Sequence, residues 1–470
     1  MTEIFDRSAL ELSAAIERRE VTCREVATAM LNRIDTLDST FHALSSRRPA
    51  EDVIAAASER DDELEQGIRR GWMHGLPHAV KDLSNVQGLP TTLGFQPAAH
   101  APVAIADDLF ASNIRAAGAV FIGKTNTPEF GLGSHTYNAI GPTTGNVVDP
   151  SLSAGGSSGG AAVAVATGMV PVADGSDFMG SLRNPPGWNG VLGLRPTAGL
   201  VPGATDDAAA QGSGVDGPIG RTAADVHALL GTMAGAGRVG PLSVPPATAK
   251  VRIAWLGDLG GYLPFEDGVV DVCREAVNRW CKDAVAVTLP GVGAFTGPDQ
   301  LWPAWRSIRH HEVGGWLAAE FGEAQIASMK PEAQWELAGF EALSARQLAY
   351  AWSVRDGIRR SLLSALEHFD LLALPTAQCW PFPSSLHWPG SVGGVPMDTY
   401  HRWMEVTTLA TLAGLPAMSV PAGTNASGLH MGLQLMGRPG ADVELLGWAA
   451  HAERAGVFAV AAPSQAAGML

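Results

Sequence analysis

The sequence predicts an α/β protein with a large core. Segments with the periodicity of amphipathic helices alternate with short apolar runs that suit buried strands. Hydrophobic residues make up 46% of the 470 residues and charged residues only 17%, which describes a compact chain with little room for disorder. A chain of this length suggests about three domains, but large single α/β units are also known.

Helices and strands are expected in turn along the chain. Ser8 with Glu11, and Thr22 with Glu25, have the capping-box spacing that starts a helix. Helices are predicted at residues 8–19, 22–37, 50–65, 107–117, 222–233, 269–281, 344–369 and 441–454. Strands are predicted at residues 75–82, 119–122, 191–195, 251–255, 371–374, 417–420 and 429–436, the last two paired with each other. Residues 202–216 and 234–246, rich in glycine and alanine, are expected to be connections.

Charge and residue spacing argue against several classes of function. Lysine and arginine total 32, and aspartate and glutamate total 47, so the net charge of −15 disfavours a nucleic-acid groove. The run His310-His311-Glu312 is not expected to bind a metal, because adjacent histidines point to different faces of a helix. The cysteines without metal or disulfide spacing, expected to be reduced, are Cys23, Cys273, Cys281 and Cys379.

The chain is expected to be a cytoplasmic protein without a membrane partner. Its N-terminus lacks the basic and apolar pattern of a signal peptide. The longest apolar stretch, residues 161–173, is far short of the ~20 residues needed to cross a bilayer.

Two glycine-rich turns, each with a serine, organise the sequence. The first, residues 155–160, contains Ser157 and Ser158, and the second, residues 175–183, contains Ser181. Glycine lets the backbone approach a ligand closely and takes positive φ at little cost, so amide N–H groups can point into a cavity. The two turns therefore predict a prebuilt anion or oxyanion site.

Two segments match other well-known patterns. Residues 118–125 fit the phosphate-loop pattern G-x-x-x-x-G-K-T, but the expected strand lies between its glycines and not before them. Residues 155–159 fit the G-x-S-x-G nucleophile elbow, but the segment before them does not read as a strand. Nucleotide binding and an α/β-hydrolase fold are therefore disfavoured.

Ser181 is a candidate nucleophile. A serine hydroxyl needs a base within hydrogen-bond reach, and the neighbouring sequence supplies no histidine. Lys81, at the end of an apolar strand, is the alternative, because burial disfavours its charged form and a neutral lysine accepts a proton. Ser157 could lie between them and pass the proton along. Taken singly, Lys81 could instead be solvated beside Asp82, and Ser157 could belong to a flexible loop.

The second turn also offers an oxyanion hole. The backbone amides that it would present are those of Phe178, Met179, Gly180 and Ser181. Removing one such donor in comparable sites costs ~3 to 4 kcal/mol of barrier. Asp177 and Arg183 flank the turn closely enough to pair and stiffen it, although a mere surface ion pair is the alternative.

Several motifs in the same order resemble the amidase signature family. The matching segments are 75–82 (GLPHAVKD), 123–130 (GKTNTPEF), 155–160 (GGSSGG), 175–183 (GSDFMGSLR), 190–197 (GVLGLRPT), 414–417 (GLPA) and 432–435 (GLQL). They span most of the chain, and together they are specific; residues 235–400 add little.

The resemblance implies a Ser-cisSer-Lys triad: Ser181 as nucleophile, Ser157, after a cis peptide bond, as the bridging serine, and Lys81 as the base. The residues expected to support the triad are Ser158, Asp177 and Arg183. The resemblance further implies hydrolysis of a small to medium amide through an acyl-enzyme, with aryl amides, esters or carbamates as options and no metal or organic cofactor. The implied fold is a single large α/β domain whose mixed sheet is covered by helices on both faces.

One position departs from the family pattern. The family usually has Gly-Gly-Ser at the nucleophile, whereas this chain has Met179-Gly180-Ser181 after Phe178. If the first glycine were needed for positive φ, Met179 would be strained. We expect instead that Met179 and Phe178 narrow the acyl pocket.

A division of the chain accompanies this interpretation. Residues 1–65 are expected to form an N-terminal helical segment and residues 66–470 the catalytic domain. Within it, 66–235 and 405–470 would be the core and 236–404 a variable region around the substrate pocket. Eight of the thirteen tryptophans lie between residues 302 and 403. The candidates for the pocket wall are Phe130, Trp380, Trp388 and Trp403.

Three functions stay open at this point. The favoured one is an amidase that acts alone on a small-molecule amide. The second is the glutamine-hydrolysing subunit of a tRNA-dependent amidotransferase, which the altered glycine pair disfavours. The third is an inactive binding protein, which the complete triad disfavours. A homodimer is an expectation that the sequence leaves open.

Overall fold

A large mixed sheet runs through the structure, a computed structural model that describes residues 3–203 and 213–466. Its strands, in spatial order, are β4 (Ala173–Asp177), β6 (Val215–Gly220), β5 (Leu192–Arg195), β12 (Ala417–Thr424), β13 (His430–Met436), β9 (Leu371–Pro375), β7 (Ile253–Trp255) and β8 (Val285–Ala286). Neighbours from β4 to β9 are antiparallel, whereas β9, β7 and β8 run parallel. The predicted α/β class is therefore confirmed, and the sheet is mixed.

A smaller sheet lies beside the edge strand β4. It consists of β1 (Leu44–Arg47), β3 (Val120–Thr125) and β2 (Pro77–Lys81), with β2 parallel and β1 antiparallel to the central β3. The backbone amide of Lys81 on β2 donates a 3.1 Å hydrogen bond to the Asp174 carboxylate on β4. The two sheets thus meet where the candidate lysine ends its strand. A separate two-stranded ribbon pairs β10 (Ser391–Val392) with β11 (Val395–Pro396).

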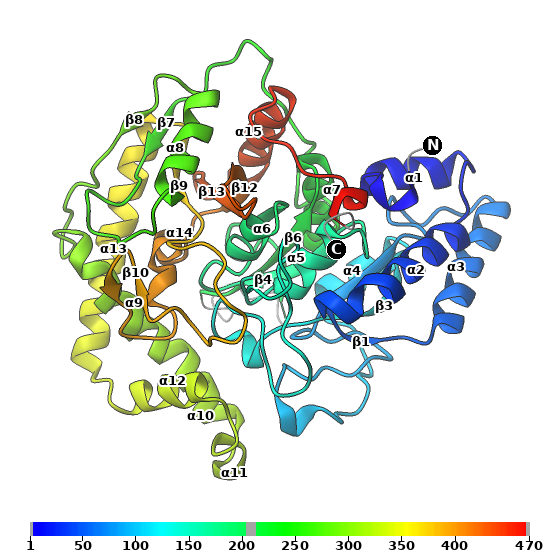
Figure 1. Cartoon of the computed structure of the whole chain (residues 1–470), viewed down its shortest axis with the longest axis horizontal. Helices are drawn as coiled ribbons and strands as arrows, with labels where there is room; N and C mark the ends of the chain where they lie inside the picture. Colours follow the sequence, from blue (N-terminus) through cyan, green and yellow to red (C-terminus); the bar gives the residue numbers. More distant parts are fainter. Residues whose placement is uncertain (1–2, 204–212, 467–470) are drawn as a thin grey trace.

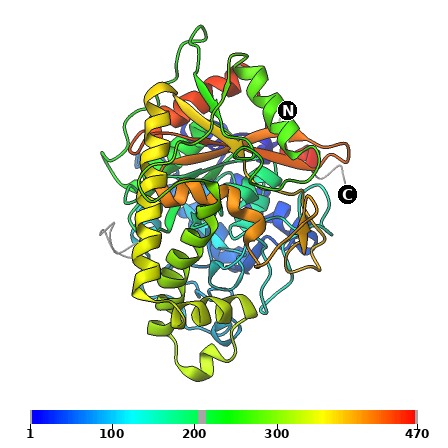
Figure 2. The ribbon, with the colours of Figure 1, turned by 90° about the vertical axis from the view of Figure 1, so that its left-hand side faces the viewer.

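Helices cover both faces of the large sheet (Figures 1 and 2). The helices α8 (Val269–Trp280) and α15 (Asp442–Arg454) pack on one face, and α6 (Asn184–Trp188) packs on the other. The longest helix, α13 (Ala345–His368), flanks the sheet beside β9, and α7 (Ala223–Ala234) packs against β6.

The remaining helices lie around this centre. They are η1 (Ile4–Asp6), α1 (Ala9–Glu17), α2 (Cys23–Phe41), α3 (Ala50–Glu65), η2 (Gln96–Ala98), α4 (Leu109–Ala116), η3 (Glu129–Gly131), α5 (Gly159–Ala166), η4 (Pro298–Gln300), α9 (Leu301–Arg309), the π-helical turn η5 (His310–Gly314), α10 (Gly315–Glu320), α11 (Glu323–Ile326), α12 (Pro331–Glu341), η6 (Arg402–Thr407), α14 (Thr408–Ala413) and α16 (Pro463–Ala466). In Figure 1, α10 to α12 form an arm at the lower left. Leu317 of this arm and Val313 of the preceding turn η5 pack against Phe95 and Phe130.

The first helices begin where the sequence predicts. Ser8 and Thr22 each complete a capping box, with Glu11 and Glu25 respectively, so two otherwise unpaired amides are satisfied at each helix start. Such a cap is worth about 1 kcal/mol. The predicted helices and strands all occur within a few residues of their expected bounds, and β12 and β13 are paired as predicted.

The prediction was wrong about two strands next to the site. The segment at residues 175–177, expected to be part of a turn, belongs to β4, and residues 215 and 216, expected to be part of a loop, begin β6. The two strands pair in register from Ala173 with Ile219 to Asp177 with Val215. Glycine, serine and aspartate have low strand propensity, so this pairing and the buried setting override local preference. The rest of the expected 202–216 connection lies mostly outside the described residues.

The expected division of the chain at residues 65, 235 and 405 stays a prediction. The first 65 residues contribute β1 as well as helices, and β1 pairs with β3.

Candidate active site

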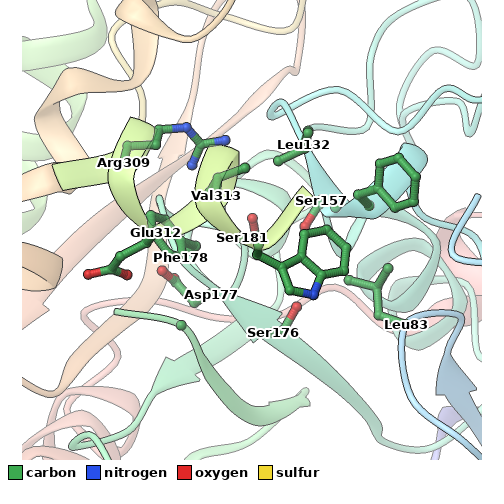
Figure 3. A pocket seen from close by; sticks show the side chains of 14 residues that line it. Leu83, Leu132, Ser157, Ser176, Asp177, Phe178, Ser181, Arg309, Glu312 and Val313 are labelled. Carbon is green, nitrogen blue, oxygen red and sulfur yellow. The ribbon is translucent and has the colours of Figure 1, made fainter. Parts of the chain in front are cut away.

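A cavity of about 440 Å³ opens at the junction of β2, β4 and the arm (Figure 3). Its lining residues are Leu83, Phe130, Gly131, Leu132, Ser157, Ser176, Asp177, Phe178, Ser181, Gly214, Arg309, Glu312, Val313 and Trp316. Polar groups gather at the floor, and apolar side chains form much of the wall. This combination is usual for sites that bind small molecules.

Lys81, the last residue of β2, contacts two serines that line this cavity, Ser157 and Ser176. Its Nζ is 2.8 Å from Ser157 Oγ, 2.9 Å from Ser158 Oγ and 2.9 Å from Ser176 Oγ. The side chain is buried, and no carboxylate among the described residues lies within ion-pair distance of Nζ. Three hydroxyls are therefore the direct partners of the amine.

This setting favours the uncharged form of Lys81. Burial lowers the pKa of Lys81 from 10.5 to about 7, against the opposing charges of Asp216, Asp174 and Asp177. An ammonium group donates to all three hydroxyls, whereas a neutral amine donates to two and accepts from the third. Near neutral pH a large fraction of Lys81 can therefore act as a proton acceptor.

Ser157 links the amine to the cavity. The peptide bond between Gly156 and Ser157 is cis, as the resemblance implies. Ser158, directly after it, is fully buried, and its Oγ accepts a 3.3 Å hydrogen bond from the Ser176 amide. The helix α5 then begins at Gly159, with no strand before the turn, so an α/β-hydrolase elbow is absent at this described segment.

Ser181 opens onto the same cavity as Ser157. Figure 3 shows both side chains at its floor. Both serines lie in the described part of the chain, and no hydrogen bond joins their hydroxyls. In unliganded sites catalytic hydrogen bonds are often long and tighten only when substrate binds.

The loop before Ser181 arranges its amides differently from the prediction. Gly180 has φ of +88°, so the positive-φ position is a glycine, and Met179 has no positive φ. Met179 is therefore not strained. The Gly180 amide donates a 2.9 Å hydrogen bond to Asp177 Oδ1 and is not available to an oxyanion. Within the described chain, the amides of Phe178, Met179 and Ser181 make no hydrogen bond, and these three stay candidates.

A buried ion-pair network supports this loop, and the predicted pairing of Asp177 with Arg183 is confirmed. The Arg183 guanidinium donates to both Asp177 oxygens, at 2.9 and 2.8 Å, and Arg195 donates to the Asp177 backbone carbonyl at 2.5 Å. Burial raises the pKa of Asp177, but the charges of Arg183 and Arg195 outweigh it and hold that pKa well below its usual range. Arg183 also binds the Gln434 side chain and, at 2.7 Å, the Thr407 carbonyl, so the network fixes the loop to β13 and η6.

Among the predicted pocket aromatics, only Phe130 lines the cavity. Trp403 is fully buried and stacks on Trp188, with ring centroids 5.4 Å apart. Trp380 donates to the Asp267 carbonyl at 3.0 Å, and Trp388 lies beside His387, both away from the described lining. The aromatic wall is instead made by Phe130, Phe178 and Trp316, the last 40% exposed.

Sequence reasoning missed several cavity residues at the end of α9 and in η5. Arg309 donates to Glu336 at 2.5 Å and to the Tyr400 hydroxyl at 2.7 Å, and its guanidinium lies 5.2 Å from the Phe178 ring centre. Glu312 accepts hydrogen bonds from the Ser213 amide and hydroxyl, at 2.8 and 2.9 Å. Arg309 ends α9, and Glu312 lies in the π-helical turn that follows it, a turn that no sequence pattern predicts. Ser176 lies inside a recognised motif, so its presence could have been expected.

The alternative motifs do not form the sites that their patterns suggest. The strand β3 (Val120–Thr125) lies between the two glycines of the phosphate-loop pattern, as expected, and contains Lys124, whose Nζ donates to the Ser84 carbonyl at 2.5 Å. His310 binds Glu336 at 3.0 Å, and residues 3–203 and 213–466 hold no cluster suited to a metal. Within the same residues, no helix is long and apolar enough to cross a bilayer.

Known proteins resemble this chain along most of its length. The sequence matches the family model described as Amidase over residues 25–254 and 322–446. It is 31% identical over 464 residues to the acylamidase of Rhodococcus erythropolis, covering 95% of this chain and 94% of the relative. It is also 34% identical over 486 residues to a glutamyl-tRNA(Gln) amidotransferase subunit of Chloroflexus aurantiacus, covering 95% of this chain and 96% of the relative.

A solved structure shares the whole fold. The crystal structure of a bacterial aryl acylamidase of the amidase signature family superposes with a TM-score of 0.85 at 25% identity and covers 98% of both chains. With the cavity, the motifs and these matches in agreement, the chain belongs to the amidase signature family and is an amide-hydrolysing enzyme.

Proposed function

We propose that this enzyme hydrolyses small to medium carboxylic amides, aryl amides among them, through an acyl-enzyme on Ser181. Ser157 is the bridging serine and Lys81 the base. The observation that carries the proposal is the 2.8 Å contact between Lys81 Nζ and Ser157 Oγ at the floor of a cavity that Ser181 also lines.

The reaction begins with neutral Lys81. Ser181 Oγ attacks the amide carbon while its proton passes to Ser157 and the Ser157 proton passes to Lys81 Nζ. The carbonyl π electrons move to oxygen, and the amides of Phe178, Met179 and Ser181 would stabilise that charge. Collapse of the intermediate breaks the C–N bond, and the proton returns through Ser157 to the leaving nitrogen. Water then attacks the acyl group by the same route and releases the carboxylic acid.

The wall of the cavity supports an apolar, aromatic group on the substrate. Phe130, Phe178 and Trp316 offer ring surfaces, and the volume of about 440 Å³ suits a small to medium molecule. An anilide would place its ring against this wall. Esters and carbamates present the same carbonyl to Ser181 and are secondary candidates.

The test combines a substrate panel with two variants. Wild type is offered an anilide, an aliphatic amide, an ester and a carbamate, and we expect the anilide to be hydrolysed. Ser181→Ala should reduce turnover to background, and Lys81→Ala should lower it by about 10²- to 10⁴-fold with the fold retained. Ser361→Ala is the matched control, because Ser361 is a buried serine on α13 away from the cavity lining. Full activity in Ser181→Ala would refute the proposal.

A second candidate function rests on the similarity to the glutamyl-tRNA(Gln) amidotransferase protein of Chloroflexus aurantiacus. In that role the same triad would release ammonia from glutamine for an ATP-using partner. The purified chain alone, offered glutamine and an anilide, distinguishes the two functions. Anilide turnover without a partner supports the first, and glutamine turnover that appears only with the partner supports the second. The third hypothesis, an inactive binding protein, is disfavoured because the chain belongs to a family of amide-hydrolysing enzymes.

A cytoplasmic location and a homodimer stay predictions. Cell fractionation tests the first, and light scattering after size exclusion tests the second.

A further inference from the structure

An acidic residue that the proposed mechanism does not use lies beside the proposed base. Asp216 stands on β6, directly opposite Ser176 on β4 in the antiparallel register. Residues directly opposite each other in such a pair point to the same face of the sheet, with Cβ atoms about 5 Å apart. Ser176 Oγ accepts a 2.9 Å hydrogen bond from Lys81 Nζ. The Asp216 side chain therefore stands on the face that holds the amine.

The neighbouring strand residue supports this placement. Asp174 lies two residues before Ser176 on β4 and so shares its face. Its carboxylate binds His78 Nε2 at 3.0 Å and the Lys81 amide at 3.1 Å, both on β2. The face of β4 and β6 that carries Asp216 is thus the face turned to β2.

The Asp216 carboxylate has no hydrogen-bond partner in the part of the chain that the structure describes. The Asp216 side chain is partly buried, and no described residue donates a hydrogen bond to its carboxylate. Among the charges that act on Lys81, that of Asp216 has the largest effect, ahead of Asp174 and Asp177. Burial, and then the charge of Asp174, raises the pKa of Asp216 to about 7. The Asp216 carboxyl and the Lys81 amine therefore titrate over the same range of pH.

The charged and titratable groups around Asp216 are few, and most are held by other partners. Those whose charge acts on Asp216 are Asp174 on β4, Lys81 on β2 and Asp108 before α4. Others on the elements packed around β4 and β6 include His78 on β2, Asp177 on β4, Arg195 on β5 and Asp225 on α7. Asp177 is engaged by Arg183 and Arg195, Asp225 accepts from the Leu10 amide, and Asp108 accepts from the Asn85 amide. Asp216 is the one of these acids, in the described chain, whose carboxylate has no hydrogen-bond donor.

We propose that Asp216 is a positioning residue that acts through Lys81: its carboxylate holds the proton on the amine and sets the pH at which the enzyme becomes active. When Asp216 is ionised, it favours the ammonium form of Lys81 across the Ser176 hydroxyl. When Asp216 carries the proton, that attraction is gone and Lys81 is released as a neutral base. The two groups titrate as a pair and not as independent sites.

The inference rests on the proposed function, because it takes Lys81 as the base. It predicts that the pH profile of kcat/KM moves in one definite direction when the Asp216 charge is removed. Asp216→Asn keeps the size of the side chain and removes the charge, so Lys81 loses its proton more easily. The acidic limb of kcat/KM should then move to lower pH by about half a unit to one unit, with the alkaline plateau retained.

The experiment measures kcat/KM from about pH 5.5 to about pH 10 for four proteins, with an anilide that wild type hydrolyses. Asp216→Glu restores a carboxylate and should return the limb toward the wild-type position. Asp442→Asn is the matched control: Asp442 is a buried acid at the start of α15, bound to Thr197, and should leave the limb unchanged. If Asp216→Asn does not fold, Asp216→Ala carries the test, because it also removes the charge and its limb should move to lower pH in the same way.

A limb in Asp216→Asn that superimposes on those of wild type and Asp442→Asn would overturn the inference, and so would a limb in Asp216→Glu that stays at the position of the Asp216→Asn limb. Ser181→Ala, assayed beside them, separates this failure from that of the proposed function. If Ser181→Ala is inactive and the limb does not move, only the role of Asp216 is wrong. If Ser181→Ala is active, the proposed function itself is wrong.

Discussion

Replacing Lys81 with methionine should remove a pH dependence from the stability of the fold. Lys81 is 1% exposed, and burial lowers its pKa from 10.5 to about 7. Between these two values the unfolded chain still binds the proton that the folded chain has released. Stability therefore rises with pH across this window. Methionine has a similar length and no proton, so the variant should lack this rise.

The magnitude follows from the two pKa values. Each pH unit between them changes the free energy of unfolding by about 1.4 kcal/mol. Over the full window, the free energy of unfolding is therefore about 5 kcal/mol lower at the acidic end than at the alkaline end. Between about pH 7 and pH 9 the wild type should gain about 2 kcal/mol in unfolding free energy that the variant does not gain. The three serine hydrogen bonds lost in the variant lower its stability at both pH values and cancel from this difference.

Urea unfolding at the two pH values, followed by tryptophan fluorescence, measures the effect. The comparison is between wild type, Lys81→Met and the control Ser361→Ala, which should follow wild type. A pH dependence that is the same in wild type and in Lys81→Met would show that the amine stays charged in the folded protein. That result would refute the reasoning that makes Lys81 a base.

Three further predictions concern rate, stability and specificity. The wild-type kcat/KM should climb with pH around a midpoint near 7, because the base is a lysine with a pKa of about 7, and a flat profile from about pH 6 to 9 with chemistry rate-limiting would contradict this. Asp177→Asn should lower the unfolding free energy by about 3 to 5 kcal/mol, since it leaves the buried Arg183 without its counter-charge; an unchanged urea midpoint would argue against the network. Trp316→Ala should raise KM for an anilide severalfold and leave KM for a small aliphatic amide unchanged, and equal effects on both would remove the aromatic wall from the account.

Much of the fold was accessible from the sequence because local signals agreed with the tertiary structure. The capping boxes at Ser8 and Thr22 and the apolar runs of β9 and β12 specify their elements without help from distant residues. The strands β4 and β6 were misjudged because glycine, serine, aspartate and proline dominate them. Their strand conformation depends on pairing with each other, which a local pattern does not contain.

The floor of the site was easier to predict than its wall. Lys81, Ser157 and Ser181 stand in motifs with recognisable chemistry. In the structure both serines line one cavity, and Lys81 contacts Ser157. The wall depends on how the arm packs, so Trp316 could not be chosen over Trp403 from composition alone. Asp216 escaped notice for a similar reason, because only the register of β4 and β6 places it beside Lys81.

The most direct test of the central claim is to identify the residue that becomes acylated. A serine-directed fluorophosphonate, or a slow substrate trapped at low pH, is reacted with the whole protein, and the modified peptide is sequenced by mass spectrometry. We predict a single adduct on Ser181 that is absent from Ser181→Ala and slow to form in Lys81→Met. An adduct on Ser157 or on any other residue, formed at the rate at which activity is lost, would contradict the account.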